Sequence, residues 1–162
     1  MREFKTVVSI ETALARLHDA LGEIASRSEM VPVDQALHRI TAEHIRSKVN
    51  VPPVDRAAMD GFAVVARDTF GASQVEPVRL TVSGSVRIGE TPSVEVEEGH
   101  ACEIATGATM PVGADAVVML EYSQRISNQF VEVHTSVAPG ENVARKGEDV
   151  QTGDLVLPKG TR

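Results

Sequence analysis

The feature that most constrains this fold is a change of pattern near Asn50. Before Asn50, apolar residues follow one another at spacings of four, three, four and three, namely Ile10, Leu14, Leu17, Leu21 and Ile24. This is the spacing of one helix face, so the sequence predicts a helix over 9–27 that is capped by Ser9. After Asn50 come short valine-rich runs separated by Gly, Pro, Ser and Asn, which are typical of strands and turns.

These runs predict a β-rich α+β protein. The intermediate segment 33–49 begins with DQAL, which favours a short turn of helix, and continues with RITAEHIRSKV, which alternates enough for a strand. We expect further strands over 61–67, 78–89, 100–106, 115–120 and 129–137.

Composition excludes several classes of protein. The formal charge of the 162-residue chain is -7, so we expect no binding to nucleic acid or to anionic lipid. No apolar run is long enough to cross a membrane. The single cysteine, Cys102, lies in a strand-like run and is predicted to be an inert core thiol, and the lack of a second thiol fits a reducing, cytoplasmic location.

A repeated unit occupies the end of the chain, where GENVARK, GEDVQT and GDLVLPK follow one another. Each unit predicts a turn at its glycine followed by a short strand. Four charged side chains crowd one of these turns: Arg145, Lys146, Glu148 and Asp149. They form either a solvated ion-pair cluster or a polar corner of a binding site.

The stretch VPPVDRAAMDGFAV, residues 51–64, is predicted to be a stiff loop that leads into a strand. Pro52 and Pro53 fix the backbone, and Asp60 precedes Gly61 as a turn-forming residue would. Asp55 is not explained by the turn, so we consider it a candidate ligand for a cation or a proton.

The stretch ATGATMPVGADAVVMLE, residues 105–121, follows a predicted strand. Thr106 and Gly107 could present a hydroxyl and a backbone N–H to an anion, or could simply form a tight turn. Phosphate-binding loops, nucleophile elbows and zinc-protease motifs are absent from the sequence, and the five histidines lack metal-ligand spacing. We therefore assign no metal ligand.

Taken together, VPPVDRAAMDGFAV, EIATGATMPVGADAVVMLE and GENVARKGEDVQTGDLVLPKGT resemble the N-terminal half of the MoeA and gephyrin E-domain family of molybdopterin molybdenumtransferases. The resemblance covers nearly the whole chain and is weakest before Ser9 and over 69–99. It implies an elongated helix-plus-strand domain from 1–49 and 144–162, with an irregular β domain inserted over 50–143. The family continues with an α/β domain and a small β domain, so we expect this chain to be a truncated piece that is inactive alone.

The resemblance also implies an activity. Family members insert molybdate into adenylylated molybdopterin with the help of a divalent cation such as Mg²⁺, and they work as homodimers. We also expect other proteins of molybdenum-cofactor biosynthesis as partners. Because their motifs match those of the family, the resemblance implies that Asp55, Thr106 and Asp149 are catalytic residues. In the same way, the resemblance implies that the neighbouring residues Asp60, Gly107 and Glu148 bind the ligand.

Two positions depart from the family pattern. Ala57 stands where many members have Ser, and Phe62 stands where Tyr is usual, so two hydroxyls are missing. An alternative function is a non-catalytic scaffold of the gephyrin type, in which the loop acids are only solvated. A third is a free-standing β domain that binds a small molecule.

Overall fold

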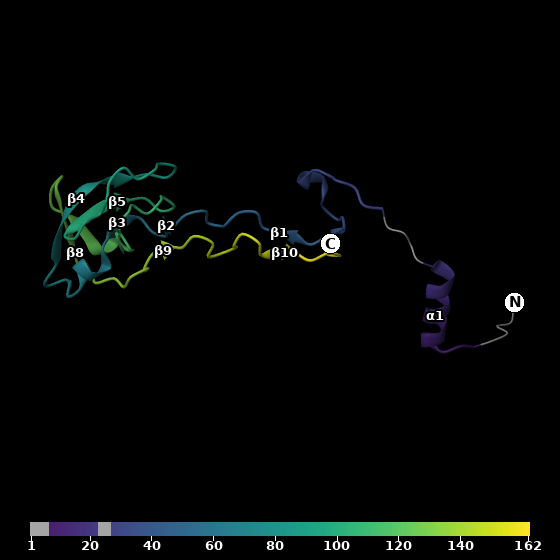
Figure 1. Cartoon of the computed structure of the whole chain (residues 1–162). Coiled ribbons are helices and arrows are strands. Elements are labelled where there is room, and N and C mark those ends of the chain that lie inside the picture. Colours follow the sequence, from purple (N-terminus) through teal and green to yellow (C-terminus); the bar gives the residue numbers. More distant parts are fainter. Residues whose placement is uncertain (1–6, 23–26) are drawn as a thin grey trace.

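The computed structural model describes residues 7–22 and 27–162 and is mostly β, with one α-helix. Figure 1 shows a curled sheet at one end, a pair of extended segments leading away from it, and α1 beyond their far end. In chain order the helical elements are α1 (Ile10–Leu21) and the 3-10 turns η1 (Val33–Gln35), η2 (Ala66–Thr69) and η3 (Leu120–Tyr122). The strands are β1 (Ile45–Arg46), β2 (Arg56–Ala57), β3 (Gly61–Val64), β4 (Val78–Val86), β5 (His100–Ile104), β6 (Ala116–Met119), β7 (Ser123–Arg125), β8 (Phe130–Val133), β9 (Val143–Ala144) and β10 (Leu155–Leu157).

Helix α1 begins as the sequence predicts and ends earlier. The Ser9 hydroxyl accepts the Thr12 N–H at 3.2 Å, which caps the first turn. At the other end Gly22 takes a positive φ of 60° and donates its N–H to His18, so the helix stops at Leu21. The predicted continuation over 23–26, including Ile24, lies outside the described residues.

The apolar stripe of α1 covers no core in this chain. None of its residues is buried, and Leu14 and Leu17 are about half exposed. Within 7–22 and 27–162 no helix has the length and apolar character needed to cross a membrane.

The sheet contains six strands in the order β6-β3-β5-β4-β8-β7. All neighbours are antiparallel except β4 and β5, which run parallel with Val86 opposite Ile104. Strands were predicted at five of these six places, and the predictions ran two to five residues too long. The short strand β7 was missed.

Both faces of the sheet are buried. In β3, Phe62 and Val64 join one core cluster, while Ala63 joins the cluster on the opposite face. β6 alternates in the same way, with Val118 on the first face and Val117 on the second. The cores are built from valine and alanine rather than from large side chains, as expected for a chain with 3% aromatic residues.

Two extended segments, 41–58 and 142–161, run antiparallel and form what we call the ribbon. β1 pairs with β10 and β2 pairs with β9. Further backbone hydrogen bonds join Val51 to Val150 at 2.8 Å and Ala58 to Asn142 at 2.8 Å. The predicted strand over 39–49 is only two residues long here, because irregular hydrogen bonds replace a continuous ladder.

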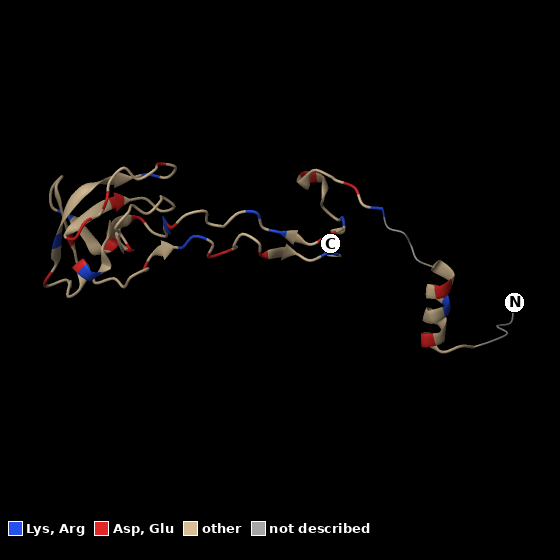
Figure 2. Cartoon of the chain, viewed as in Figure 1, with Lys and Arg blue, Asp and Glu red and all other residues tan. Residues whose placement is uncertain are grey.

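Charge is distributed unevenly along the molecule, as Figure 2 shows. Residues 57–141, which include the sheet, carry twelve acidic and four basic side chains. Residues 41–56 and 142–162, which include the ribbon, carry five acidic and seven basic ones. The net negative charge of the chain therefore belongs to the sheet, and the ribbon is slightly basic.

Candidate functional site

Asp60 and Thr106 form the most closely connected pair among the predicted site residues. One carboxylate oxygen of Asp60, Oδ1, accepts the Thr106 N–H at 2.7 Å and the Thr106 hydroxyl at 2.8 Å. The backbone hydrogen bond from Thr106, followed by the side-chain one, lowers the pKa of Asp60. We expected Asp60 to shape a local turn, but its carboxylate instead binds a residue 46 positions away.

The backbone of Gly107, the next residue, is also held by a hydrogen bond within the protein. Its φ of 83° lies in the left-handed region, and its N–H donates to the Ala57 carbonyl at 2.8 Å. We predicted the Thr106 hydroxyl and a backbone N–H as donors to an anion, or a tight turn. The Thr106 hydroxyl donates to Asp60 and the Gly107 N–H donates to Ala57, so both groups are used within the protein. The turn holds the Thr106 side chain at the end of β5, where it is exposed.

Asp55 holds the ribbon together at the point where it meets the sheet. Its Oδ1 accepts the Lys146 N–H at 2.7 Å, and its carbonyl accepts the Met110 N–H at 3.0 Å. Its second carboxylate oxygen has no partner among the described residues. Asp55 thus ties together three chain segments and keeps one oxygen available.

Glu148 has a local role that the repeated units share. Its Oε2 accepts the Arg145 N–H at 2.8 Å. Glu141 accepts the N–H of Ala138 and Asp154 accepts that of Gln151, each at 2.8 Å and each three residues back. The repeat is therefore a series of turns in which an acid follows a glycine and binds the first N–H of its own turn.

Asp149 differs from Glu148 because its side chain is exposed and makes no hydrogen bond within 7–22 and 27–162. Its backbone N–H donates to the Val51 carbonyl at 3.0 Å, which fixes its place on the ribbon. Its carboxylate remains available to bind a group outside the described part of the chain.

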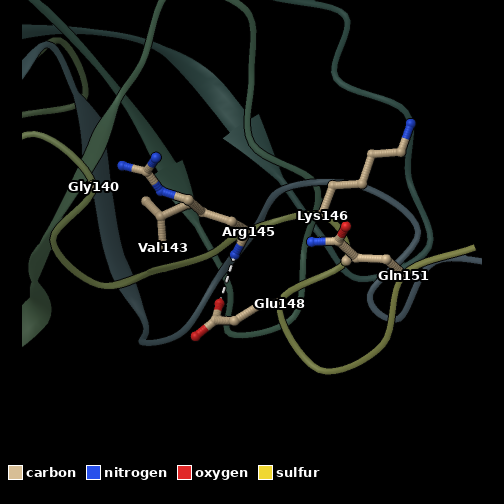
Figure 3. A pocket seen from close by; sticks show the side chains of 7 residues that line it. Gly140, Val143, Arg145, Lys146, Glu148 and Gln151 are labelled. Atoms are coloured by element: carbon tan, nitrogen blue, oxygen red, sulfur yellow. Dashed lines mark hydrogen bonds between the residues drawn. The ribbon is translucent and has the colours of Figure 1, made fainter. Parts of the chain in front are cut away.

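A hollow of about 560 Å³ lies at the crowded turn of the ribbon. It is lined by Gly140, Val143, Arg145, Lys146, Gly147, Glu148 and Gln151. Figure 3 shows Arg145 extending toward Gly140 and Lys146 extending away on the opposite side. In the described residues neither cation forms a salt bridge, whereas Arg67, Arg79 and Arg125 near the sheet do, so the predicted ion-pair cluster is not found among them.

The acids do not gather into a metal site. Over 7–22 and 27–162, no three His, Cys, Asp or Glu side chains are arranged to hold a metal ion. The described residues therefore do not form a Mg²⁺ site by themselves, and Mg²⁺ stays a prediction.

The two departures from the family pattern lie at buried positions. Ala57 is 1% exposed and Phe62 is 2% exposed. Phe62 packs in the first core cluster and Ala57 in the second. A hydroxyl at either position would need a buried partner, and these apolar side chains avoid that requirement.

The turn after β4 is a neighbour of this site that we did not predict. The Ala105 N–H donates to the Val86 carbonyl at 3.3 Å, which places the ends of β4 and β5 side by side. Ile88, in the turn after β4, lies 3.9 Å from the position that a Cβ atom on Gly107 would occupy. Parallel pairing of distant strands leaves no local sequence signal, so no motif could have indicated this contact.

Comparison with known proteins places this geometry in a family. Residues 8–162 match the model of the MoeA N-terminal region, described as domain I and II. A molybdopterin molybdenumtransferase from Bacillus subtilis is 38% identical over the whole chain, and one from Synechococcus elongatus is 34% identical over 96% of it. The chain spans 38% and 39% of the lengths of these two relatives.

Solved structures agree with the sequence relatives. A crystal structure of a molybdopterin biosynthesis moeA protein from Pyrococcus horikoshii OT3 superposes with a TM-score of 0.88 and 42% identity. That match covers 95% of this chain and 40% of the Pyrococcus chain. The three motifs, the fold and the match over 8–162 lead to one conclusion: this chain belongs to the MoeA N-terminal region family.

Proposed function

We propose that this chain acts in molybdenum-cofactor biosynthesis as the N-terminal part of a molybdopterin molybdenumtransferase. In this function, molybdate is inserted into adenylylated molybdopterin. The observation that carries the proposal is the family match together with the way the fold holds Asp55, Thr106 and Asp149 in place.

The charges at the turn of the ribbon support anionic substrates. Arg145 and Lys146 line the hollow without a salt bridge to any described residue. Guanidinium and ammonium groups without an internal partner can bind molybdate or phosphate oxygens. The nearby acids Asp55 and Glu148 each use one carboxylate oxygen to accept a backbone N–H rather than to bind either cation.

We assign the catalytic roles to the groups that keep free oxygen atoms. Asp55 and Asp149 each keep a carboxylate oxygen without a described partner, and such oxygens can orient water or accept a proton. Thr106 presents its hydroxyl oxygen at the end of β5 as an acceptor, since its proton is donated to Asp60.

We also propose that the protein works as a homodimer with residues 50–143 as an inserted β domain. The apolar stripe of α1 is uncovered, and on the ribbon Ile45 and Leu157 are each 40% exposed. Burying such surfaces against a second copy would stabilise a dimer by roughly 25 cal/mol per Å² of apolar area. Other proteins of molybdenum-cofactor biosynthesis are further candidate partners.

A chimera tests the proposed activity. Residues 8–162 of this chain would replace the matched part of the Bacillus subtilis relative, and cofactor formation would be measured by activation of a cofactor-free molybdoenzyme. We expect the chimera to be active and to dimerise. A folded, dimeric chimera without activity would overturn the proposal.

Variants of the same chimera test the residue assignments. We expect Asp55→Ala, Thr106→Ala and Asp149→Ala each to reduce insertion by about tenfold or more while dimerisation, measured by light scattering, is unchanged. Glu141→Ala is the control, because Glu141 is an exposed acid in one of the repeated turns and lies outside the assigned set. Full activity in both Asp55→Ala and Asp149→Ala would remove the site assignment.

A further inference from the structure

One edge of the sheet gathers the turns that surround Asp60. β4 and β5 are the parallel pair, so both strands end at this edge, with Val86 opposite Ile104. β3 starts here, because Gly61 pairs with Ile104, and β6 ends here, because Gly61 also pairs with Met119. Four strand ends therefore place their adjoining loops around one point.

Three large apolar side chains lie on these loops, and we call them together the apolar collar: Met59, Ile88 and Leu120. They are 36%, 70% and 54% exposed, respectively. Met59 precedes Asp60, and the Leu120 N–H donates to the Asp60 carbonyl at 2.9 Å. Ile88 lies beside Gly107: its side chain is 3.9 Å from the position that a Cβ atom added to Gly107 would occupy.

Asp60 offers a carboxylate acceptor beside the collar, and the N–H groups of Thr106 and Gly107 are already used within the protein. Asp60 Oδ1 takes both hydrogen bonds from Thr106, and Oδ2 has no partner within the described part of the chain. The Gly107 N–H is used by Ala57. Because the bonds from Thr106 lower the pKa of Asp60, its carboxylate is ionised at neutral pH.

The ionised Asp60 carboxylate and the exposed apolar side chains together favour one kind of ligand. An ionised acceptor repels phosphate and molybdate and attracts neighbouring N–H groups. Exposed Met, Ile and Leu side chains favour a flat, weakly hydrated ring surface. A heteroaromatic ring whose edge carries an N–H beside an amino group satisfies both requirements.

We propose that Asp60 and the apolar collar bind the aminopyrimidinone edge of the pterin ring, with the carboxylate accepting from the ring N–H and the 2-amino group. The identity of the ring rests on the proposed function. This edge of the sheet forms one wall of the binding site and separates the ring of the substrate from its anionic groups, which Arg145 and Lys146 on the ribbon would face.

Nuclear magnetic resonance of the full chain tests this binding directly, because the Thr106 amide reports on the carboxylate that it binds. We expect free pterin to shift the Thr106 amide resonance. Lumazine, which has a carbonyl in place of the 2-amino group, should not shift it, since a carbonyl would face a carboxylate. AMP should also leave it in place, because the Watson–Crick edge of adenine has a bare ring nitrogen beside its amino group. An equal response to lumazine or AMP would overturn the proposal.

Three variants complete the test. Ile88→Ser should weaken pterin binding at least about threefold, because it removes an apolar contact. Asp60→Asn can still accept from Thr106 while turning an amide donor toward the ring, so it should abolish the response. Val75→Ser is the control, since Val75 is 90% exposed but precedes β4, at the opposite end of that strand. Unchanged binding in Ile88→Ser or Asp60→Asn, or a requirement for Mg²⁺ in the wild type, would overturn the inference.

The outcome is separate from that of the activity test, because the titration requires no turnover. An active chimera with no pterin response would overturn this inference alone. A specific pterin response with an inactive chimera would leave the binding site in place and overturn the proposed activity.

Discussion

Asp60 binds Thr106 through a single carboxylate oxygen, which accepts the backbone N–H at 2.7 Å and the hydroxyl at 2.8 Å. The contact joins the start of β3 to the end of β5 and fixes the turn that carries Gly107. The residue that we expected to shape its own loop therefore positions a different one, and Thr106 depends on Asp60 for its orientation.

The Asp60 carboxyl should titrate below an ordinary aspartate, because hydrogen bonds from Thr106 lower its pKa. A lowered folded-state pKa adds stability that is fully present above the unfolded value of about 3.9 and is lost as the pH falls through the folded value. The Thr106 amide resonance, followed from pH 7 downward, measures this transition. Asp60→Asn should abolish it and Asp34→Asn should not, whereas a midpoint at or above the ordinary value would contradict the prediction.

Thr69 should be important for stability because its buried hydroxyl joins two segments. It donates to the Ala66 carbonyl at 2.7 Å and accepts the Val137 N–H at 3.0 Å. Thr69→Val leaves that buried N–H without a partner, so we expect a loss of about 1–3 kcal/mol in the free energy of unfolding, measured in urea. Thr69→Ser keeps the hydroxyl and should lose less, and equal losses would show that the hydroxyl is unimportant.

Gly113 and Gly71 form a matched pair for testing a close backbone contact. Both have positive φ, 90° and 87°, but a Cβ on Gly113 would lie 2.2 Å from the Val96 carbonyl oxygen and one on Gly71 would contact nothing within 4 Å. Gly71→Ala should cost about 1–2 kcal/mol from backbone strain alone. Gly113→Ala should cost clearly more in the same thermal unfolding measurement, and equal costs would count against the contact.

Cys102 should be unreactive in the folded protein. It is fully buried, and burial, followed by the charge of Glu103, raises its pKa to about 11. At pH 8 only about one thiol in a thousand would be ionised even if reagent could reach it. A disulfide reagent should label Cys102 only after unfolding in urea, so rapid labelling of the native protein would contradict this assignment.

Ser9 should affect α1 and nothing else. Ser9→Ala removes the cap on Thr12 and should reduce helix stability by about 1 kcal/mol, seen as lower helical circular dichroism. The unfolding midpoint of the sheet should not change, because α1 buries no residue in this chain. Ser9→Asp should restore the helical signal. A lower sheet midpoint in Ser9→Ala would show that α1 stabilises the sheet.

Local patterns predicted most of the sheet and the beginning of α1. The valine-rich runs around Val64 and Val118 became strands because period-two burial is encoded residue by residue. The three repeated turns could also be predicted from the sequence, since glycine followed by an acid is a local signal for a turn.

Long-range pairing could not be predicted from the same patterns. Asp55 reaches Lys146 and Ile88 reaches the Gly107 turn only because the ribbon and the parallel β4–β5 pair bring them together. The strand predicted over 39–49 was too long, because its partner segment contains turns at Gly153 and Gly160. The assigned site residues stay predictions, and the structure adds the partners that hold them in place.

We expect the ribbon to fold after the sheet. Asn50 accepts a hydrogen bond from Thr152, 102 positions later, and closing a free loop of that length carries a large entropic cost. Once the intervening sheet has folded, the two segments that leave it start close together. The ribbon can then form its hydrogen bonds in order, from β2 and β9 toward β1 and β10. The part of the molecule that forms last is also expected to open first, so hydrogen exchange should be fastest at the end of the ribbon farthest from the sheet.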